Sequence, residues 1–158
     1  MSLTSVHPLW SSCSANPYEV NKAVIQARML SGRYRTQSLR SHFNSESTPC
    51  CQLCLSNEPE NLTHILIECK ALESMRNNVM CGWLKTQQPE ILNTVLESLH
   101  DDSTVQFLLD CSVIASVIAL TQTINKDIVL PSLFKLTRNY CYNLHKERQK
   151  LLGLWDKL

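Results

Sequence analysis

Residues 51–69 read CQLCLSNEPENLTHILIEC, and they carry the most specific signal in this chain of 158 residues. Cys51 and Cys54 are three positions apart; nine residues then separate Cys54 from His64, and four separate His64 from Cys69. Structural zinc takes four ligands in a tetrahedron, and three cysteines with one histidine are a common set. The spacing therefore predicts one Zn²⁺ held by these four residues. Because four protein ligands leave no open position, we expect a structural site rather than a catalytic one.

The second half of this ligand set has a geometric constraint. His64 and Cys69 are five residues apart, which is about 140° of rotation on an ideal α-helix. Both side chains can face one ion only if the helix ends between them. We therefore expect His64 on a short helix that starts near Glu58-Pro59, and Cys69 just beyond the end of that helix.

The cysteines also allow roles without a metal. One alternative is a group of buried or free cysteines near a histidine by chance. Another is a redox-active Cys-x-x-Cys pair, although no strand–helix pattern of the thioredoxin type surrounds it. Cys50 is a rival ligand; we place it outside the set because position 53 is leucine, which leaves it no partner three residues away. The single cysteines are expected to be core thiols. They are Cys13, Cys81, Cys111 and Cys141.

Other features of the sequence indicate the cellular compartment of the protein. The N-terminal residues lack the basic start and long apolar run of a secretory signal. A disulfide framework is therefore disfavoured, and clustered thiols in a reducing compartment indicate metal ligands. The apolar run 111–120 is shorter than the roughly 18 residues that a membrane span needs. We expect an intracellular protein, nuclear or cytoplasmic and not secreted, with no membrane partner.

Helical periodicity dominates the chain, and no stretch alternates as a strand would. The sequence predicts a mainly α fold of about six helices, with a small CCHC zinc module inserted near residues 50–69. The first expected helix starts at Asn16-Pro17 and ends near Gly32, and the last is opened by Pro131. Between them, helices are expected at 34–43, 71–86, 89–99 and 104–121, the last of these capped by Asp101–Ser103.

Four ranges follow from these patterns. They are an irregular N-terminus (1–15), a basic helical segment (16–48), the zinc module with the following helix (49–87) and a C-terminal helical region (88–158). The final helix is expected to be amphipathic, with its apolar side chains on or near one face. These are Leu133, Leu136, Tyr140, Leu144 and Leu151.

Charge is distributed unevenly although the net charge is only +1. Residues 20–45 hold five bases and no acid, whereas residues 46–134 hold eleven acids and four bases. Guanidinium groups bind phosphates and aromatic rings stack on unpaired bases, and Tyr34 and Phe43 are interleaved with the bases. We therefore expect nucleic acid, either RNA or single-stranded DNA, to bind this segment; the alternative is a solvated helix face. The candidate contacts are Lys22, Arg28, Arg33, Arg35 and Arg40.

A second basic group lies near the C-terminus. It can extend the binding surface, or it can be the solvated side of the terminal helix, and we favour the second interpretation. It consists of Arg138, His145, Lys146, Arg148 and Lys150.

Three further stretches carry a resemblance. They are ARMLSGRY at 27–34, LRSHF at 39–43, and the ligand set with ECKAL at 68–72 and Arg76. Together they resemble the segment downstream of the reverse transcriptase domain in polyproteins of non-LTR (LINE-type) retrotransposons. A Cys-Cys-His-Cys zinc module follows the polymerase thumb there, and the resemblance implies the same four ligands here. It covers residues 20–80 most specifically, is weaker to residue 150, and implies a role in holding nucleic acid near a polymerase.

The catalytic parts of that family have no counterpart in this sequence. Its adjacent acidic pair, Asp101-Asp102, precedes a helical pattern, and a helix N-terminus that favours negative charge explains it better than a polymerase site does. We therefore expect no enzyme activity. Three functions remain open: a nucleic-acid-binding zinc module, a zinc-stapled helical module for protein interaction, and a nonfunctional retroelement remnant that still folds around its metal.

Overall fold

The computed structural model describes residues 6–84, 101–114 and 126–154 of the chain. This part is mainly helical and contains no β-strand, which confirms the expected class; the number of helices is close to the six expected. One isolated antiparallel bridge joins Cys50 to Pro59. No described helix is long and apolar enough to cross a bilayer.

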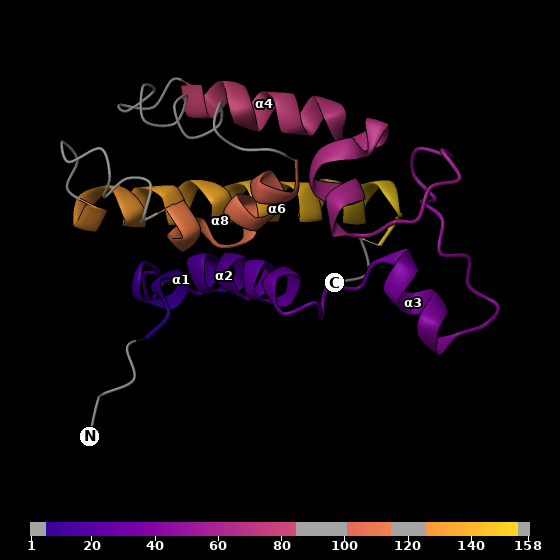
Figure 1. The fold of residues 1–158 in the computed structure, drawn as a ribbon, viewed down its shortest axis with the longest axis horizontal. Coiled ribbons are helices and arrows are strands. Elements are labelled where there is room, and N and C mark those ends of the chain that lie inside the picture. Colours follow the sequence, from indigo (N-terminus) through magenta and orange to yellow (C-terminus); the bar gives the residue numbers. More distant parts are fainter. Residues whose placement is uncertain (1–5, 85–100, 115–125, 155–158) are drawn as a thin grey trace.

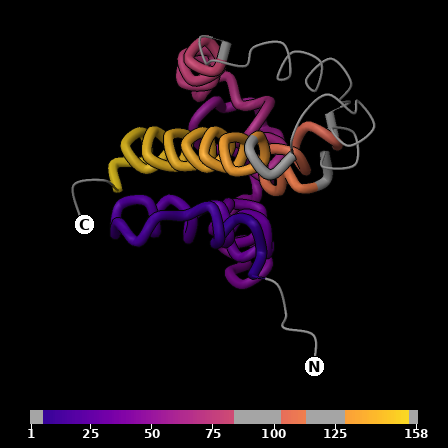
Figure 2. Tube along the Cα trace, turned by 90° about the vertical axis from the view of Figure 1, so that its left-hand side faces the viewer, coloured from indigo at the N-terminus to yellow at the C-terminus, as the bar shows by residue number. Residues whose placement is uncertain are grey.

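The long helix α8 (Lys126–Leu151) is the centre of the fold. Figure 1 shows α2 (Pro17–Leu30) on one side of it and α4 (Glu73–Leu84) on the other, and the turned view in Figure 2 keeps the same order. The helix α6 (Asp101–Leu109) packs against α8 and reaches α2. Burial of apolar side chains between these helices is the main stabilising force.

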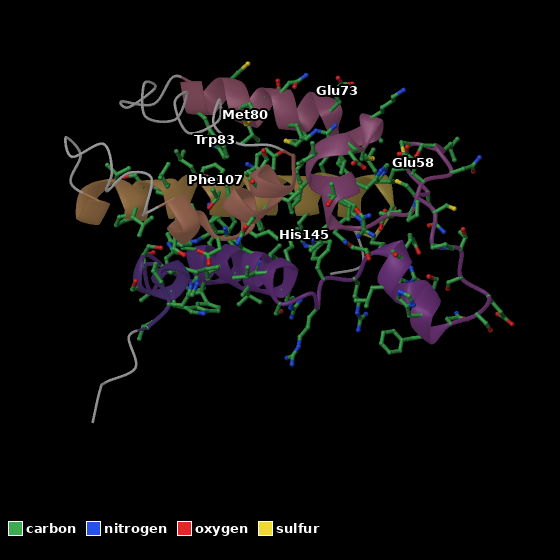
Figure 3. The ribbon with its side chains drawn as sticks, in the orientation of Figure 1. Glu58, Glu73, Met80, Trp83, Phe107 and His145 are labelled. Carbon is green, nitrogen blue, oxygen red and sulfur yellow. The ribbon has the colours of Figure 1, made fainter. Side chains whose placement is uncertain are left out.

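Side chains from all of these helices meet in one core. Phe134 and Leu144 of α8 are fully buried, as is Phe107 of α6. On the α4 side, Trp83 lies against Tyr140 with 5.4 Å between ring centroids, in the layer that Figure 3 shows between α4 and α8. The four ranges expected from the sequence therefore contribute to a shared apolar cluster.

The helix α2 follows its sequence signals closely. The side chain of Asn16 accepts a hydrogen bond from the backbone N–H of Tyr18 at 2.9 Å, and Pro17 occupies the first helical position. Two residues after the helix, Gly32 has φ +68°, a left-handed conformation that glycine adopts without steric cost. The expected start and end of this helix are confirmed.

Other boundaries differ from expectation for local reasons. The helix expected at 34–43 is α3 (Gln37–Phe43). It starts later than expected because the Thr36 side chain caps it by accepting a hydrogen bond from Leu39 N–H. Residues 101–103 are already helical, and α6 stops at Leu109 instead of continuing to 121. Asp110 there accepts hydrogen bonds from the backbone N–H and hydroxyl of Ser112, which starts a 3-10 helix, η3 (Cys111–Ile114). The helix expected at 89–99 lies outside the described residues.

The terminal helices also correct two predictions. Pro131 lies inside α8 and does not open it, because flanking residues such as Val129 and Leu133 are buried and hold the helix together across the proline. Leu151 was expected on the apolar face, but it is 46% exposed at the helix end. Within the range expected to be irregular, Pro8–Ser11 forms a short helix, α1, that buries Leu9.

The single cysteines divide into two groups. Cys111 and Cys141 are buried as expected, and burial raises the pKa of each thiol to about 12. Cys13 is only half-buried and Cys81 is exposed, so the prediction of a core position is wrong for Cys81. Cys81 lies on α4, next to Met80, which packs against the core.

Candidate metal centre

The four predicted ligands come together at one point of the structure. One ligand atom from each of Cys51, Cys54, His64 and Cys69 lies within 4.8 Å of all the others. The Sγ atoms of Cys51 and Cys69 are 3.9 Å apart, and Cys54 Sγ lies 3.3 Å from His64 Nε2. Two thiolates at about 2.3 Å from a tetrahedral ion would be roughly 3.8 Å apart. The arrangement can therefore hold a metal ion.

A short closed loop positions the first two cysteines. The N–H of Cys51 donates to the Glu58 carbonyl at 2.9 Å, and the N–H of Glu60 donates to the Pro49 carbonyl at 2.9 Å. Between these bonds the backbone passes through the left-handed region at Leu55 (φ 54°) and Asn57 (φ 60°). This conformation is unfavourable for leucine and is kept only where the surroundings fix it.

A π-helical turn, η1 (His64–Glu68), positions the other two ligands. The N–H of Cys69 donates to the His64 carbonyl at 2.7 Å, a bond between residues five apart. This wider turn brings residues five positions apart onto one side, which an α-helix does not do. The expected place of Cys69 just beyond the helix is confirmed. The helix itself starts later than Glu58-Pro59, because Asn61 caps it by accepting from His64 N–H at 2.8 Å.

The second ring nitrogen of His64 faces two carboxylates. His64 Nδ1 lies 3.4 Å from Glu58 Oε2 and 3.6 Å from Glu68 Oε2, and the histidine is buried. A histidine that binds metal through Nε2 carries its proton on Nδ1, and a carboxylate is the usual acceptor of that proton. Sequence reasoning missed both residues; the spacing of four between His64 and Glu68 was the available signal, and Glu58 had none.

The thiols differ strongly in acidity. Burial raises the pKa of Cys51 and that of Cys69, the latter to about 12; the sulfurs of Cys51 and Cys54 raise the pKa of Cys69 further. Burial opposes ionisation of Cys54 as well, but hydrogen bonds with Ser56, Cys51 and His64 outweigh it and bring the pKa to about 6. Three thiolates in one cluster repel each other, so a cation is needed to hold all of them ionised.

Cys50 lies outside the cluster, as expected. Its thiol donates to the backbone carbonyl of Asn57 at 3.3 Å, and its sulfur is not among the four gathered ligands. The side chain therefore helps to close the loop and leaves the ligand set unchanged.

A buried carboxylate joins this segment to the helices. Glu60 is fully buried and pairs with Arg148 of α8 at 2.5 Å, while its Oε1 also accepts from the backbone N–H of Gln37 at 2.9 Å. The Cys51 thiol donates to Glu60 Oε2 at 3.9 Å. The solvated position expected for Arg148 is therefore wrong. Its spacing of four from the buried Leu144 was the missed signal, since both lie on one helix face.

Two other basic residues are buried, although Arg138 was expected on the solvated side of the last helix and Lys22 was a candidate contact to nucleic acid. Arg138 is buried and donates to the Leu9 carbonyl at 3.1 Å and to the Ser12 hydroxyl at 2.7 Å, which fastens α1 to α8. Lys22 is buried and donates to Glu19 at 2.8 Å and to Asn139 at 2.9 Å. Both side chains are therefore engaged by partners within the protein, and Lys22 is buried whereas the arginines of its segment are exposed.

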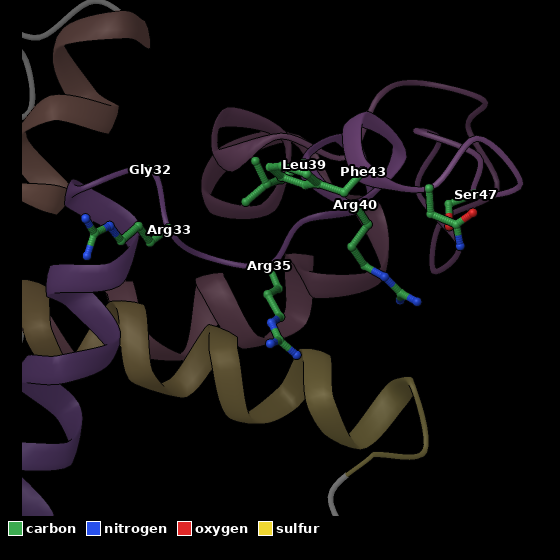
Figure 4. A pocket seen from close by; sticks show the side chains of 8 residues that line it. Gly32, Arg33, Arg35, Leu39, Arg40, Phe43 and Ser47 are labelled. Atoms are coloured by element: carbon green, nitrogen blue, oxygen red, sulfur yellow. The ribbon is translucent and has the colours of Figure 1, made fainter.

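The four arginines of the basic segment remain exposed, and they line two neighbouring hollows. One, of about 560 Å³, includes Arg33, Arg35 and Arg40 (Figure 4). The other, of about 790 Å³, includes Arg28 together with Arg33 and Arg35. No acidic residue lines either hollow.

Comparisons of this chain with protein families, with curated proteins and with solved structures found no match in any of the three. The fold and the site together define a mainly helical protein with a Cys3His cluster that can hold a metal ion.

Proposed function

We propose that the chain is a zinc-stabilised helical module that binds nucleic acid, RNA or single-stranded DNA, and has no catalytic role of its own. One observation carries the proposal: the metal segment is hydrogen-bonded to α3, the helix that presents Arg40. Glu60 accepts the N–H of Gln37 at the start of α3, and Gln37 donates from its side chain to Gln52 at 3.0 Å. Metal binding would therefore fix the position of Arg40 on that helix.

The ligand chemistry supports zinc. Three thiols and one imidazole are soft or borderline donors, which magnesium and calcium do not prefer. The cluster is largely buried and supplies four ligands, as closed structural zinc sites do. The carboxylates of Glu58 and Glu68 lie 3.4 and 3.6 Å from His64 Nδ1, where a ligating imidazole needs an acceptor.

The exposed arginines support nucleic acid as the partner. Arg28, Arg33, Arg35 and Arg40 form no ion pair with another residue in the described ranges. Their guanidinium groups are therefore available to phosphates, which they can bind through two parallel hydrogen bonds. The resemblance of residues 20–80 to the segment after the reverse transcriptase domain of LINE-type retrotransposons supports the same function.

Titration with oligonucleotides at several salt concentrations tests this proposal. For a single strand, each phosphate that the protein neutralises adds about 0.7 to the slope of log affinity against log salt. Replacing Arg33, Arg35 and Arg40 with glutamine should therefore reduce the slope by about two units while zinc stays bound.

A matched control removes three charges elsewhere. Lys135, Lys146 and Lys150 are exposed on α8 and line neither hollow. Their replacement with glutamine should change the slope by clearly less. Equal slopes in the two triple variants would contradict binding through the arginines.

A second candidate function is protein interaction. The hollow with Arg40 also contains Leu39 and the exposed ring of Phe43, which an acidic partner with apolar side chains could contact. Absence of salt-dependent oligonucleotide binding in the zinc-loaded protein would favour this candidate or the retroelement remnant.

A further inference from the structure

The two aromatic residues of the basic segment have opposite environments. Tyr34 is 5% exposed, and its hydroxyl is hydrogen-bonded to His145 Nδ1 at 2.9 Å. Its ring also meets the His145 imidazole edge to face. Phe43, at the end of α3, is 86% exposed, the highest value among the exposed large apolar side chains of the described residues. Tyr34 therefore belongs to the interior, whereas Phe43 has a free ring face.

The surroundings of Phe43 combine apolar and cationic groups. Leu39, one helical turn earlier, lines the same hollow of about 560 Å³, as do Arg35 and Arg40. In Figure 4, Leu39 and Phe43 lie close together and the guanidinium groups of Arg35 and Arg40 extend away from them. An apolar platform beside cations matches a nucleotide, which joins a flat base to a phosphate.

We infer that Phe43 is a stacking platform for an unpaired base, with Arg35 and Arg40 binding the adjacent phosphates. This inference rests on the nucleic-acid binding proposed above and narrows it to single-stranded segments. Bases in a duplex are paired and stacked on each other, so their faces cannot reach the ring. Stacking on an aromatic ring tolerates any base, because every base has a π-face.

The test uses two fluorescent single strands of equal length, one an oligothymidylate and the other carrying abasic sites. The two strands have the same phosphates and differ in their bases. The zinc-loaded protein should bind the first more tightly. Phe43→Ala should weaken binding to the oligothymidylate by about 5- to 150-fold, the range of stacking contributions measured by alanine substitution. Binding to the abasic strand should not change.

Two variants control for indirect effects. Phe43→Trp keeps a stacking ring and should retain the affinity for oligothymidylate. Trp10→Ala removes an exposed aromatic residue of α1, which lines neither arginine hollow, and should change neither affinity. Zinc content measured on each variant reports whether the metal segment is intact.

The outcomes separate this inference from the proposed function. If both strands bind equally and Phe43→Ala changes neither, nucleic-acid binding stands and the stacking role is wrong. If Phe43→Ala weakens both strands equally, the ring acts through the structure of the arginine surface, which also overturns the inference. If neither strand binds at all, the proposed function itself fails.

Discussion

The segment of residues 50–69 and the packed pair α2–α8 differ in what holds them together. The helices bury apolar side chains such as Met29 and Phe134 against each other. In the segment, three of the four gathered metal-ligand side chains are buried, and one of its turns holds a leucine in a left-handed conformation. Such a turn gains little from the hydrophobic effect. We therefore expect the loop between Cys50 and Pro59 to depend on a bound ion, in contrast to the helix pair, which folds by burial of apolar side chains.

Metal removal should give the largest difference between the two regions. Structural zinc contributes about 10–16 kcal/mol of apparent binding free energy, and this is also folding free energy for the region that it organises. Chelation, or Cys54→Ser, should abolish hydrogen-exchange protection at Cys51 and Cys69 while most of α8 stays protected. Mass spectrometry of exchange measures both regions in one experiment.

The neighbouring cysteine provides the control for this experiment. Cys50→Ser should keep one zinc per chain, because the Cys50 sulfur lies outside the cluster. Loss of protection along α8 equal to that of the segment would show that the two regions fold as one unit. Equal zinc loss in both serine variants would show that the ligand set is wrong.

The ion pair between Glu60 and Arg148 connects the two regions, and breaking it should have the next largest effect. Arg148→Met leaves the Glu60 carboxylate buried without its partner, which costs about 3–5 kcal/mol of unfolding free energy. Lys150→Met, on the exposed side of the same helix, should change stability by less than about 0.5 kcal/mol. Urea denaturation of the zinc-loaded protein measures both variants.

The double variant Glu60→Met/Arg148→Met isolates the unpaired charge. Removing both partners eliminates the buried charge, so the double variant should be more stable than Arg148→Met alone. A double variant as unstable as the sum of the two single variants would show that the pair contributes little beyond the space its side chains fill.

The fold and the ligand set were largely predictable from the sequence. The four ligands have a recognisable spacing, and Asn16, Pro17 and Gly32 mark the ends of α2 because each has a specific role in a helix terminus. The π turn at His64–Glu68 was not predictable, because periodicity assumes one value of residues per turn. The helix ends before Cys69 as expected, but its last turn is wider than that of an α-helix.

The burial of three basic side chains could not be predicted from sequence patterns. A basic residue on a helix is expected to face solvent, yet Lys22, Arg138 and Arg148 are buried because each has a polar partner from a distant part of the chain. Such pairs depend on tertiary contacts that span about 90 to 130 residues. Local pattern carries no information about them.

The carboxylates beside His64 allow the metal segment to be weakened without removing a ligand. Replacing Glu58 and Glu68 with glutamine removes the negative charges that lie beside His64 Nδ1. Loss of such partners lowers metal affinity by about 10- to 100-fold. Glu46→Gln, an exposed change on the linker before the cluster, should leave the affinity unchanged. Competition with a chromophoric chelator measures the constants. An unchanged affinity in the double variant would show that Nδ1 needs no carboxylate partner.

The smallest expected effect is on the pH dependence of stability, and it concerns His145 of α8. Burial, with the charges of Arg148 and Arg28, lowers the pKa of His145 to about 4 from its ordinary value of 6.5. Between these values the unfolded chain binds a proton that the folded protein does not, so stability falls as pH falls from 6.5 towards 4. His145→Gln removes this titration and can still accept a hydrogen bond from Tyr34. Both proteins keep the same metal cluster, whose own pH dependence cancels when the two are compared. The variant should therefore lose about 1 kcal/mol less than the wild type between pH 7 and pH 5, after allowance for the partial solvent exposure of His145. Urea denaturation at the two pH values measures the difference, and equal losses would show that His145 takes up its proton equally in the folded and unfolded chain.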